Sequence, residues 1–263
     1  MSKTILITGA GTGIGRDAAF ALAARGHMLI ATTFNEAQAV ALRSECSRQG
    51  VAMEIFALDI TDAAQRERIR PLVLDVLINN AGIGESGSLA EVDMDRVRRN
   101  FEVNVFSTLA LTQVALAGMI RRRSGTVLLV SSIAGRLPMP FLMPYSMTKF
   151  ALSAGGAGLR NELDELRCNV HVALIEPGAI HTGFNQAMTE RKYDWMGPDS
   201  YFHAHVERIK RRERKTFAFL EARSTRGIVA QIVKAAEARR PRLRYVSPWA
   251  QGLVVRLARM FGV

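Results

Sequence analysis

The stretch "TGAGTGIG" at residues 8–15 decides how the start of this chain is organised. It follows a short apolar run, "TILITG" at 4–9, and precedes "GRDAAFALAARG" at 15–26, where apolar residues recur at helical spacing. The pattern is not G-x-G-x-x-G, because Ile14 occupies the last glycine position of that pattern. A glycine-rich turn between a first strand and a first helix lets backbone N–H groups approach a pyrophosphate. The alternative is a tight turn that binds no ligand.

Strands and helices continue to alternate along the rest of the chain. Further buried strands are predicted at 27–33, 53–59, 75–82, 125–132 and 169–178, and helical segments at 35–50, 61–70, 91–117 and 145–166. Near-continuous apolar strands with helices between them indicate a parallel sheet covered on both faces. No repeat, linker or break in composition interrupts the 263 residues. The predicted fold class is therefore α/β, a single-domain Rossmann-type doubly wound parallel sheet over residues 1–263.

The composition is that of a globular protein with a basic surface. Hydrophobic residues make up 48% and charged residues 22%, and the formal net charge is +11. Basic clusters at 121–123, 210–215 and 239–244 carry no interleaved aromatic residues of a nucleic-acid motif. A solvated surface with no nucleic-acid partner is the interpretation that we favour. Cys46 and Cys168 offer neither a disulfide framework nor a metal site.

The two ends of the sequence bear on location. A strand is predicted almost at once after Met1, which leaves no room for a signal peptide. No stretch approaches the roughly 20 apolar residues that a membrane span needs. These observations predict a cytoplasmic protein. In the C-terminal segment, about 245–263, Trp249, Leu253, Leu257 and Met260 or Phe261 fall at helical spacing. Packing against the flap or a partner subunit is favoured, and a membrane-surface helix is the alternative.

The stretch "PYSMTKF" at 144–150 pairs a tyrosine with a lysine. On a helix, Tyr145 and Lys149 lie one turn apart on the same face. A lysine ammonium close to a phenol favours the phenolate and lowers the pKa of the tyrosine from roughly 10. The pair would then be a proton donor that works near neutral pH, although taken alone it could be an accident of a surface helix.

Six motifs in order resemble those of the short-chain dehydrogenase/reductase family. They are Thr8-Gly9-x-x-x-Gly13-Ile14-Gly15, "NNAG" at 79–82, Asn104, Ser132, Tyr145-x-x-x-Lys149, and Pro177-Gly178 with Thr182. Ser132 stands thirteen residues before Tyr145, the spacing of the family, and Ser131 is its neighbour. The resemblance runs from residue 4 to about residue 185.

The resemblance implies a catalytic set of Asn104, Ser132, Tyr145 and Lys149. Tyr145 would exchange a proton with the substrate oxygen as a general acid or base. Lys149 would lower the pKa of the tyrosine and bond the nicotinamide ribose, Ser132 would donate a hydrogen bond to the carbonyl oxygen, and Asn104 would hold a water.

The resemblance also implies an NAD or NADP site. Its expected residues, besides Tyr145 and Lys149, are Gly9, Thr12, Gly13, Ile14, Thr33, Asp59, Ile60, Asn80, Ala81, Gly82, Pro177, Gly178, Ile180 and Thr182. Thr33 stands where NAD enzymes carry an acid, and Phe34 where NADP enzymes often carry arginine. Because Arg16 and Arg43 could supply charge, NADP is slightly favoured. Asp59 would bond the adenine amine, or only cap the end of a strand.

The segment 183–216 is expected to form a flap over the site. Candidate substrate contacts are Met139, Leu142, Phe184 and Met188. These side chains suggest an apolar, fairly bulky substrate, unless they only pack the flap against the core. No metal is expected, since His203 and His205 have no third ligand nearby. A short helix is expected between Asp59 and Asn79.

The predicted function is an NAD(P)-dependent oxidoreductase acting on a secondary alcohol or carbonyl, with likeness to hydroxysteroid and retinol dehydrogenases. The alternatives are a nucleotide-sensing binding protein and an enzyme similar to sugar-nucleotide epimerases or dehydratases. Gly155, Gly156 and Gly158 interrupt a helix at a cost of roughly 1 kcal/mol each. Contact with another subunit would compensate, which predicts a homodimer or homotetramer; the alternative is close packing against the chain's own sheet.

Overall fold

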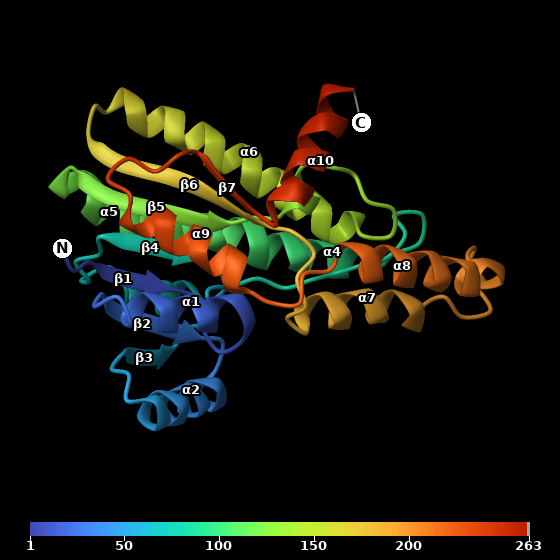
Figure 1. Cartoon of the computed structure of the whole chain (residues 1–263), viewed down its shortest axis with the longest axis horizontal. Coiled ribbons are helices and arrows are strands. Elements are labelled where there is room, and N and C mark those ends of the chain that lie inside the picture. The colour runs from blue at the N-terminus through green and yellow to red at the C-terminus, as the bar shows by residue number, and fades with distance from the viewer. Residues whose placement is uncertain (262–263) are drawn as a thin grey trace.

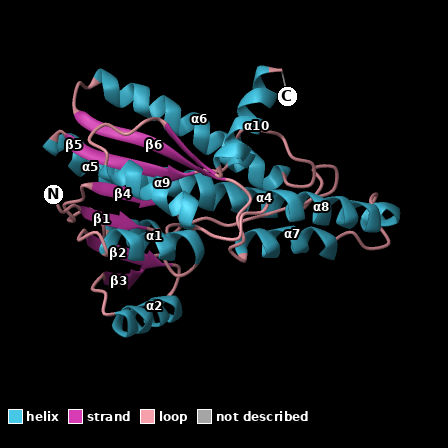
Figure 2. Ribbon diagram, in the orientation of Figure 1, coloured by secondary structure: helices cyan, strands magenta, loops and turns pink. Residues whose placement is uncertain are grey.

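A seven-stranded sheet forms the centre of the molecule in the computed structural model, which describes the backbone of residues 1–261 and the side chains of these except at 189 and 216–220 (Figures 1 and 2). The strand order is β3-β2-β1-β4-β5-β6-β7, and every neighbouring pair is parallel. The strands are β1 (Thr4–Ile7), β2 (Met28–Thr33), β3 (Glu54–Ala57), β4 (Val76–Asn79), β5 (Ser124–Val130), β6 (Asn169–Pro177) and β7 (Arg244–Ser247).

Helices cover both faces of this sheet. On one face, α1 (Gly13–Ala23), α2 (Glu36–Gln49) and α9 (Arg226–Glu237) bury apolar side chains in one core cluster. On the other face, α5 (Thr108–Arg122) and α6 (Met143–Glu165) contribute to a second cluster. Figure 1 shows α1 and α9 together on the near side of the strands. The predicted doubly wound parallel sheet is therefore confirmed.

The strand order reverses at the centre of the sheet. β1 pairs with β2 on one side and with β4 on the other, so the chain winds outward in two directions from this point. In open α/β sheets, ligands bind in the crevice at the carboxyl ends of the strands next to such a reversal. The topology alone therefore predicts a ligand site where β1 and β4 end.

Two elements were not foreseen from the sequence. β7 has only four residues, with alternating burial, and α9 precedes it. The chain after the predicted flap was interpreted only through its apolar C-terminal spacing. These two elements complete the sheet edge beside β6 and cover it.

The long helix expected at 91–117 is interrupted by a different helical geometry. It consists of α4 (Met94–Phe101), a π-helical segment at Glu102–Ser107, and then α5. By length and hydropathy the continuous helix Met94–Arg122 could cross a membrane, which the sequence analysis overlooked, but 56% of its most apolar window is buried in this fold. Packing against the sheet accounts for its apolar character.

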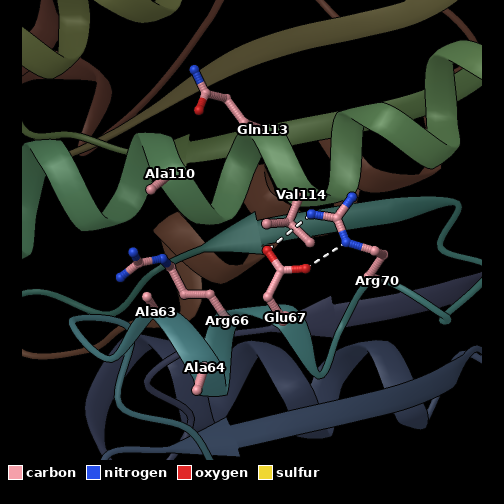
Figure 3. Close-up of a pocket in the computed structure, with 8 residues that line it drawn as sticks. All are labelled: Ala63, Ala64, Arg66, Glu67, Arg70, Ala110, Gln113 and Val114. Carbon is pink, nitrogen blue, oxygen red and sulfur yellow. Dashed lines mark hydrogen bonds and ion pairs between the residues drawn. The ribbon is translucent and has the colours of Figure 1, made fainter.

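The short helix expected before β4 is present as α3 (Ala63–Glu67). An open hollow of about 480 Å³ lies between α3 and α5, and Figure 3 shows the ion pair of Glu67 and Arg70 within it. None of the predicted site residues lines this hollow. It therefore does not belong to the candidate site.

The expected flap is a pair of helices at the carboxyl edge of the sheet. They are α7 (Phe184–Asp194) and α8 (Val206–Leu220), joined through a short 3₁₀ turn at His203–His205. Figure 1 shows the two helices side by side, extending beyond the sheet, with α10 (Trp249–Met260) leaving the same edge in another direction.

Candidate active site

The glycine-rich turn after β1 is shaped by close backbone contacts. Gly9 has a φ of +66°, and a Cβ there would lie 2.8 Å from the Cα of Ala81. A Cβ on Gly15 would lie 2.5 Å from the carbonyl oxygen of Gly9. Only glycine allows the turn, the helix and the segment after β4 to approach this closely.

The start of α1 suits an anionic ligand. Thr12, at its N-cap, makes no side-chain capping bond, and no acidic residue lies in the first turn. Three other helices, α2, α3 and α4, have their first N–H groups bound by Asn35, Asp62 and Asp93. The N–H groups of α1 thus have no such acceptor, and they fit the pyrophosphate of a dinucleotide.

The "NNAG" segment holds the glycine turn against β4. The side-chain amide of Asn80 donates to the carbonyl oxygens of Thr8 and Gly9 at 2.9 and 3.0 Å. The Thr8 hydroxyl oxygen accepts the backbone N–H groups of Asn80 and Ala81, both at 3.0 Å. The side chain of Asn80 is therefore committed to supporting the turn.

Gly82 lies between two of the predicted catalytic residues. A Cβ there would be 3.0 Å from Oδ1 of Asn104 and 3.8 Å from Nζ of Lys149. The segment after β4, the π-helical segment and α6 thus meet around a residue without a side chain. This arrangement keeps space at the centre of the candidate site.

Asn104 lies in the π-helical segment and is fixed by four hydrogen bonds. Its Nδ2 donates to the carbonyl oxygen of Ile83 at 2.8 Å, to Oδ1 of Asn100 at 3.0 Å and to Oγ1 of Thr148 at 3.1 Å. Its Oδ1 accepts the N–H of Ile83 at 2.9 Å. Single π turns within α-helices are rare and occur frequently at functional sites. Here the turn connects Asn104 to α6 and to the segment after β4.

The structure distinguishes the two serines that follow β5. The hydroxyl of Ser131 contacts the carbonyl oxygen of Lys149 at 3.1 Å and the hydroxyl of Ser153 at 2.7 Å, so it joins β5 to α6. Ser132 instead hydrogen-bonds the phenol of Tyr145, and its hydroxyl donates to the carbonyl oxygen of Pro177 at 3.3 Å. Ser132 is the serine beside the tyrosine, as the spacing predicts.

Tyr145 and Lys149 lie on one face of α6 and are both buried. Nζ of Lys149 is 5.5 Å from the centre of the tyrosine ring and donates to the carbonyl oxygen of Val130 at 2.9 Å. Burial lowers the pKa of Lys149 to about 8. The same ammonium borders the space beside Gly82, because this residue has no side chain to fill the space.

The pKa of Tyr145 does not follow the expectation from the sequence. Burial raises the pKa of this phenol, and the hydrogen bond with Ser132 opposes the rise only in part. Lys149 does not lower it, because its ammonium bonds Val130 rather than the phenol. The expected lowering of the tyrosine pKa by Lys149 is therefore wrong.

The predicted adenosine end of the site lies at the ends of β2 and β3. Thr33 is buried, and its hydroxyl donates to the carbonyl oxygen of Asn35 at 2.9 Å, while the Phe34 ring is 60% exposed. Oδ1 of Asp59 accepts both the N–H and the hydroxyl of Thr61, at 2.9 and 2.8 Å. Oδ1 of Asp59 thus caps the strand end, and a bond from this carboxylate to the adenine amine stays a prediction.

The two arginines considered for a 2′-phosphate both have carboxylate partners. Arg16 lies 3.0 Å from Asp17 and 3.8 Å from Glu45. Arg43 forms an ion pair with Glu36. Both guanidinium charges are therefore already balanced by carboxylates. The electrostatic reason for favouring NADP is weaker than the sequence indicates.

The segment after β6 is held by a residue that the sequence analysis missed. The side-chain oxygen of Gln251, in α10, accepts the N–H of Ala179 at 2.9 Å, and a Cβ on Gly178 would collide with it. Ile180 is buried and forms an isolated bridge with Ala222. The sequence shows Gln251 as a polar, uncharged residue among the mostly apolar residues of α10. Nothing in the sequence indicates which group it bonds.

Thr182 approaches the glycine turn from the other side. Its Cβ lies 3.6 Å from the position of a Cβ on Gly13. Ile14, next in the turn, packs against the core beneath α1. The end of β6 and the start of α1 thus converge, as expected for two parts of one dinucleotide site.

Three of the four predicted substrate contacts gather at Tyr145. Met188 and Leu142 pack with the tyrosine in a small apolar cluster, and the ring of Phe184 lies 5.9 Å from the tyrosine ring. Met139 is 37% exposed and is not part of this cluster. The first turns of α7 thus cover the candidate proton donor.

The flap is held in this position by contacts that sequence reasoning missed. The carboxylate of Glu91 accepts the hydroxyl of Ser200 at 2.7 Å and the N–H of Tyr201 at 3.0 Å. Phe202 packs edge to face on Phe141 at 5.0 Å. All of these pairs are far apart in the sequence, so no local pattern reveals them.

Known proteins resemble this chain over most of its length. The family model described as short chain dehydrogenase matches residues 3–193. An uncharacterized oxidoreductase, YusZ, of Bacillus subtilis is 33% identical, over 79% of this chain and 75% of its own. Dehydrogenase/reductase SDR family member 7B of Mus musculus is 35% identical, over 70% of this chain and 59% of its own.

A third relative and a solved structure extend the comparison. The 17-beta-hydroxysteroid dehydrogenase 13 of Rattus norvegicus is 27% identical, over 82% of this chain and 74% of its own. A short-chain dehydrogenase from Streptomyces avermitilis matches with a TM-score of 0.78 at 27% identity, covering 99% of this chain and 93% of its own. The chain belongs to the short-chain dehydrogenase family of NAD(P)-dependent oxidoreductases.

Proposed function

We propose that this protein transfers a hydride between a nicotinamide dinucleotide and a secondary alcohol or carbonyl whose substituents are apolar and fairly bulky. The observation that carries the proposal is the arrangement at Tyr145. The phenol is hydrogen-bonded to Ser132, lies one helical turn from the buried Lys149, and is covered by apolar side chains of the flap.

The chain's own residues would handle the proton and the developing charge. The bound nicotinamide supplies or accepts the hydride. The Tyr145 hydroxyl would give its proton to the substrate oxygen in reduction and take it back in oxidation. Ser132 would donate a hydrogen bond to that oxygen, which stabilises negative charge as it develops. In the structure its hydroxyl contacts the Tyr145 phenol and the Pro177 carbonyl.

Lys149 and Asn104 would support this chemistry without contacting the substrate oxygen themselves. The ammonium of Lys149 is buried beside Gly82, where it could bond a ribose hydroxyl and offer positive charge near the phenol. Asn104 shares that space through its Oδ1. The asparagine would position water for the return of the proton.

The substrate class is inferred from the side chains around the tyrosine. Leu142 and Met188 are apolar, and the aromatic ring of Phe184 stands against the phenol. Methionine adapts its shape to irregular ligands. A relative named as a hydroxysteroid dehydrogenase agrees with a bulky apolar substrate.

A direct assay tests the proposal. Oxidation of NADH and NADPH at 340 nm, measured with ketones, aldehydes, steroids and retinoids, should show the highest kcat/KM for large apolar carbonyls. Cofactor binding is measured in parallel by the fluorescence of the reduced nicotinamide. Tight cofactor binding with no turnover across the panel would favour the nucleotide-sensing alternative and contradict the proposal.

The cofactor preference should be weak and easily changed. Thr33→Asp places a carboxylate where a 2′-phosphate would lie, and Phe34→Arg places a cation on an exposed position beside it. Coulomb repulsion or attraction of a few kcal/mol at about 4 Å is enough to change the ratio of kcat/KM for NADP over NAD by roughly tenfold. The first variant should lower this ratio and the second should raise it. An unchanged ratio in both would show that the end of β2 does not bind the ribose.

The glycines of α6 support the proposal of a homo-oligomer. A Cβ on Gly156 would lie 2.8 Å from side chains of Leu129 and Leu174, so this glycine packs on the chain's own sheet. A Cβ on Gly155 or Gly158 would meet nothing within 4 Å, so both face outward. The packing alternative therefore holds for Gly156, and the assembly prediction rests on Gly155 and Gly158.

Gly158→Leu should dissociate the oligomer, because a large side chain blocks close approach of a second helix. Sedimentation velocity at micromolar concentration measures the outcome. Gly155→Ala is informative as well, since without an interface it should stabilise the helix by roughly 1 kcal/mol. A wild-type protein that sediments as a monomer would contradict the prediction.

A further inference from the structure

Helix α10 has a broad apolar face that no described part of the chain covers. The exposed apolar side chains on it are Trp249, Leu253, Val254, Leu257 and Met260, with Phe261 directly after the helix. Trp249 is 76% exposed and Phe261 is 81% exposed. The expected packing of this apolar face against the flap is therefore wrong. The other half of that prediction, packing against a partner subunit, competes with a lipid surface as the occupant of the face.

The opposite face of the same helix is firmly attached to the body. Val255 and Gln251 are buried, and Gln251 bonds the backbone of Ala179. Successive residues of a helix are about 100° apart. Trp249, Leu253, Leu257 and Met260 therefore form one stripe that points away from the buried pair.

The charge of this segment has one sign. Residues 238–263 contain six arginines and neither aspartate nor glutamate. Two of the arginines, Arg256 and Arg259, are exposed in the helix, and at 100° per residue they border the stripe on one side. A wide apolar face with tryptophan and leucine, bordered by arginine, is typical of helices that lie in a membrane interface.

The length and charge of the helix determine which occupant fits. Twelve residues extend about 18 Å, too short for a hydrocarbon layer of about 30 Å, so the helix cannot span a membrane. A second copy paired about a two-fold axis would bring arginines together, and α10 has no carboxylate to neutralise them. Anionic lipid headgroups supply that negative charge.

We propose that α10 attaches the protein to an anionic lipid surface, with its axis in the plane of the interface and its apolar stripe in the lipid. α8 leaves the same edge of the sheet (Figures 1 and 2). It bears exposed basic residues. Its two carboxylates are paired, Glu207 with Lys210 at 3.4 Å and Glu213 with Lys192. α8 thus adds exposed positive charge at this end of the molecule.

The attachment has a consequence for the candidate site. Because Gln251 holds the segment after β6, the lipid surface would lie next to the edge at which the site is built. Apolar substrates dissolved in the lipid would then be close to the flap. The lipid attachment itself does not depend on the proposed reaction and is tested without substrate.

Co-sedimentation of the full chain with lipid vesicles tests this inference. The wild-type protein should bind vesicles of phosphatidylcholine and phosphatidylserine at a ratio of about 7:3, weaken with added salt, and bind pure phosphatidylcholine poorly. Leu253→Glu with Leu257→Glu should lower the partition coefficient by at least about tenfold. Arg256→Gln with Arg259→Gln should lower it by roughly fivefold per arginine and reduce the salt dependence.

A matched control keeps the test specific. Val40→Glu with Val73→Glu introduces the same two charges at exposed apolar positions away from α10, and it should leave vesicle binding unchanged. All changed side chains are exposed, so circular dichroism and Tm should match the wild type. Three results would overturn the inference: no binding to anionic vesicles at low salt, equal binding by the Leu253→Glu, Leu257→Glu protein, or an oligomer that this variant dissociates while neither protein binds vesicles.

Discussion

Tyr145→Phe should reduce kcat by at least about 100-fold while the dissociation constant of the reduced cofactor changes little. The substitution keeps the ring, which packs with Met188 and Phe184, and removes only the hydroxyl that would give the proton. Steady-state oxidation of the cofactor at 340 nm and fluorescence titration measure the two quantities. The loss should appear in kcat and kcat/KM alike, because the hydroxyl acts in the transition state.

Tyr245→Phe is the matched control for this prediction. Tyr245 is also buried, and its hydroxyl oxygen accepts the N–H of Arg242 at 3.1 Å, away from the candidate site. This variant should retain turnover and lose only a small part of the stability. If Tyr145→Phe turned over as fast as Tyr245→Phe, the assigned role of Tyr145 would be wrong.

Lys149→Met should lose both turnover and cofactor affinity, because it removes the buried charge beside the tyrosine and a donor for the ribose. Lys149→Arg, which retains a positive charge, should recover part of the affinity. The decrease should exceed tenfold in each quantity if one charged hydrogen bond to the cofactor is lost, which is worth roughly 1.5–3 kcal/mol. Fluorescence titration and the assay at 340 nm separate the two effects.

The same variant should change how stability depends on pH. Burial lowers the pKa of Lys149 from 10.5 to about 8, so between these values the unfolded chain binds more protons than the folded one. The free energy of unfolding of the wild type should therefore rise with pH from about 8 to about 10.5, by on the order of 3 kcal/mol more than that of Lys149→Met. Urea unfolding without cofactor measures the difference, and parallel pH profiles would show that Lys149 is not buried as described.

Residue spacing and the family resemblance together predicted the centre of the candidate site. Tyr145 and Lys149 lie at a fixed distance on one helix, whereas the "NNAG" segment and Ser132 were identified through the resemblance. Because parallel strands end at one edge of the sheet, residues at several strand ends could be placed together without a structure. The structure places Ser132, Tyr145 and Lys149 next to one another in this way.

Contacts between distant segments could not be predicted. The bond between Gln251 and Ala179 joins residues that are 72 positions apart, and the bond between Glu91 and Tyr201 spans 110 positions. Neither pair has a local pattern, and each depends on how the last strand and the flap pack. β7 was missed for a related reason, since four residues with alternating burial give little signal without the neighbouring β6.

The pKa of Tyr145 shows a second limit of sequence reasoning. The spacing of the two residues predicts their common face but not the depth at which they lie. In the structure both are buried, and desolvation outweighs the effect that a nearby ammonium would have in water. The direction of the shift therefore depends on tertiary packing.

Transfer of deuterium to the substrate, from reduced nicotinamide that carries deuterium at both C4 positions, tests the central claim most directly. With a large apolar ketone from the panel, the alcohol formed by the wild-type protein should carry one deuteron on the former carbonyl carbon, as measured by mass spectrometry. Tyr145→Phe should form the same labelled alcohol at least about 100-fold more slowly. Cofactor oxidation that leaves the alcohol unlabelled would contradict hydride transfer at this site.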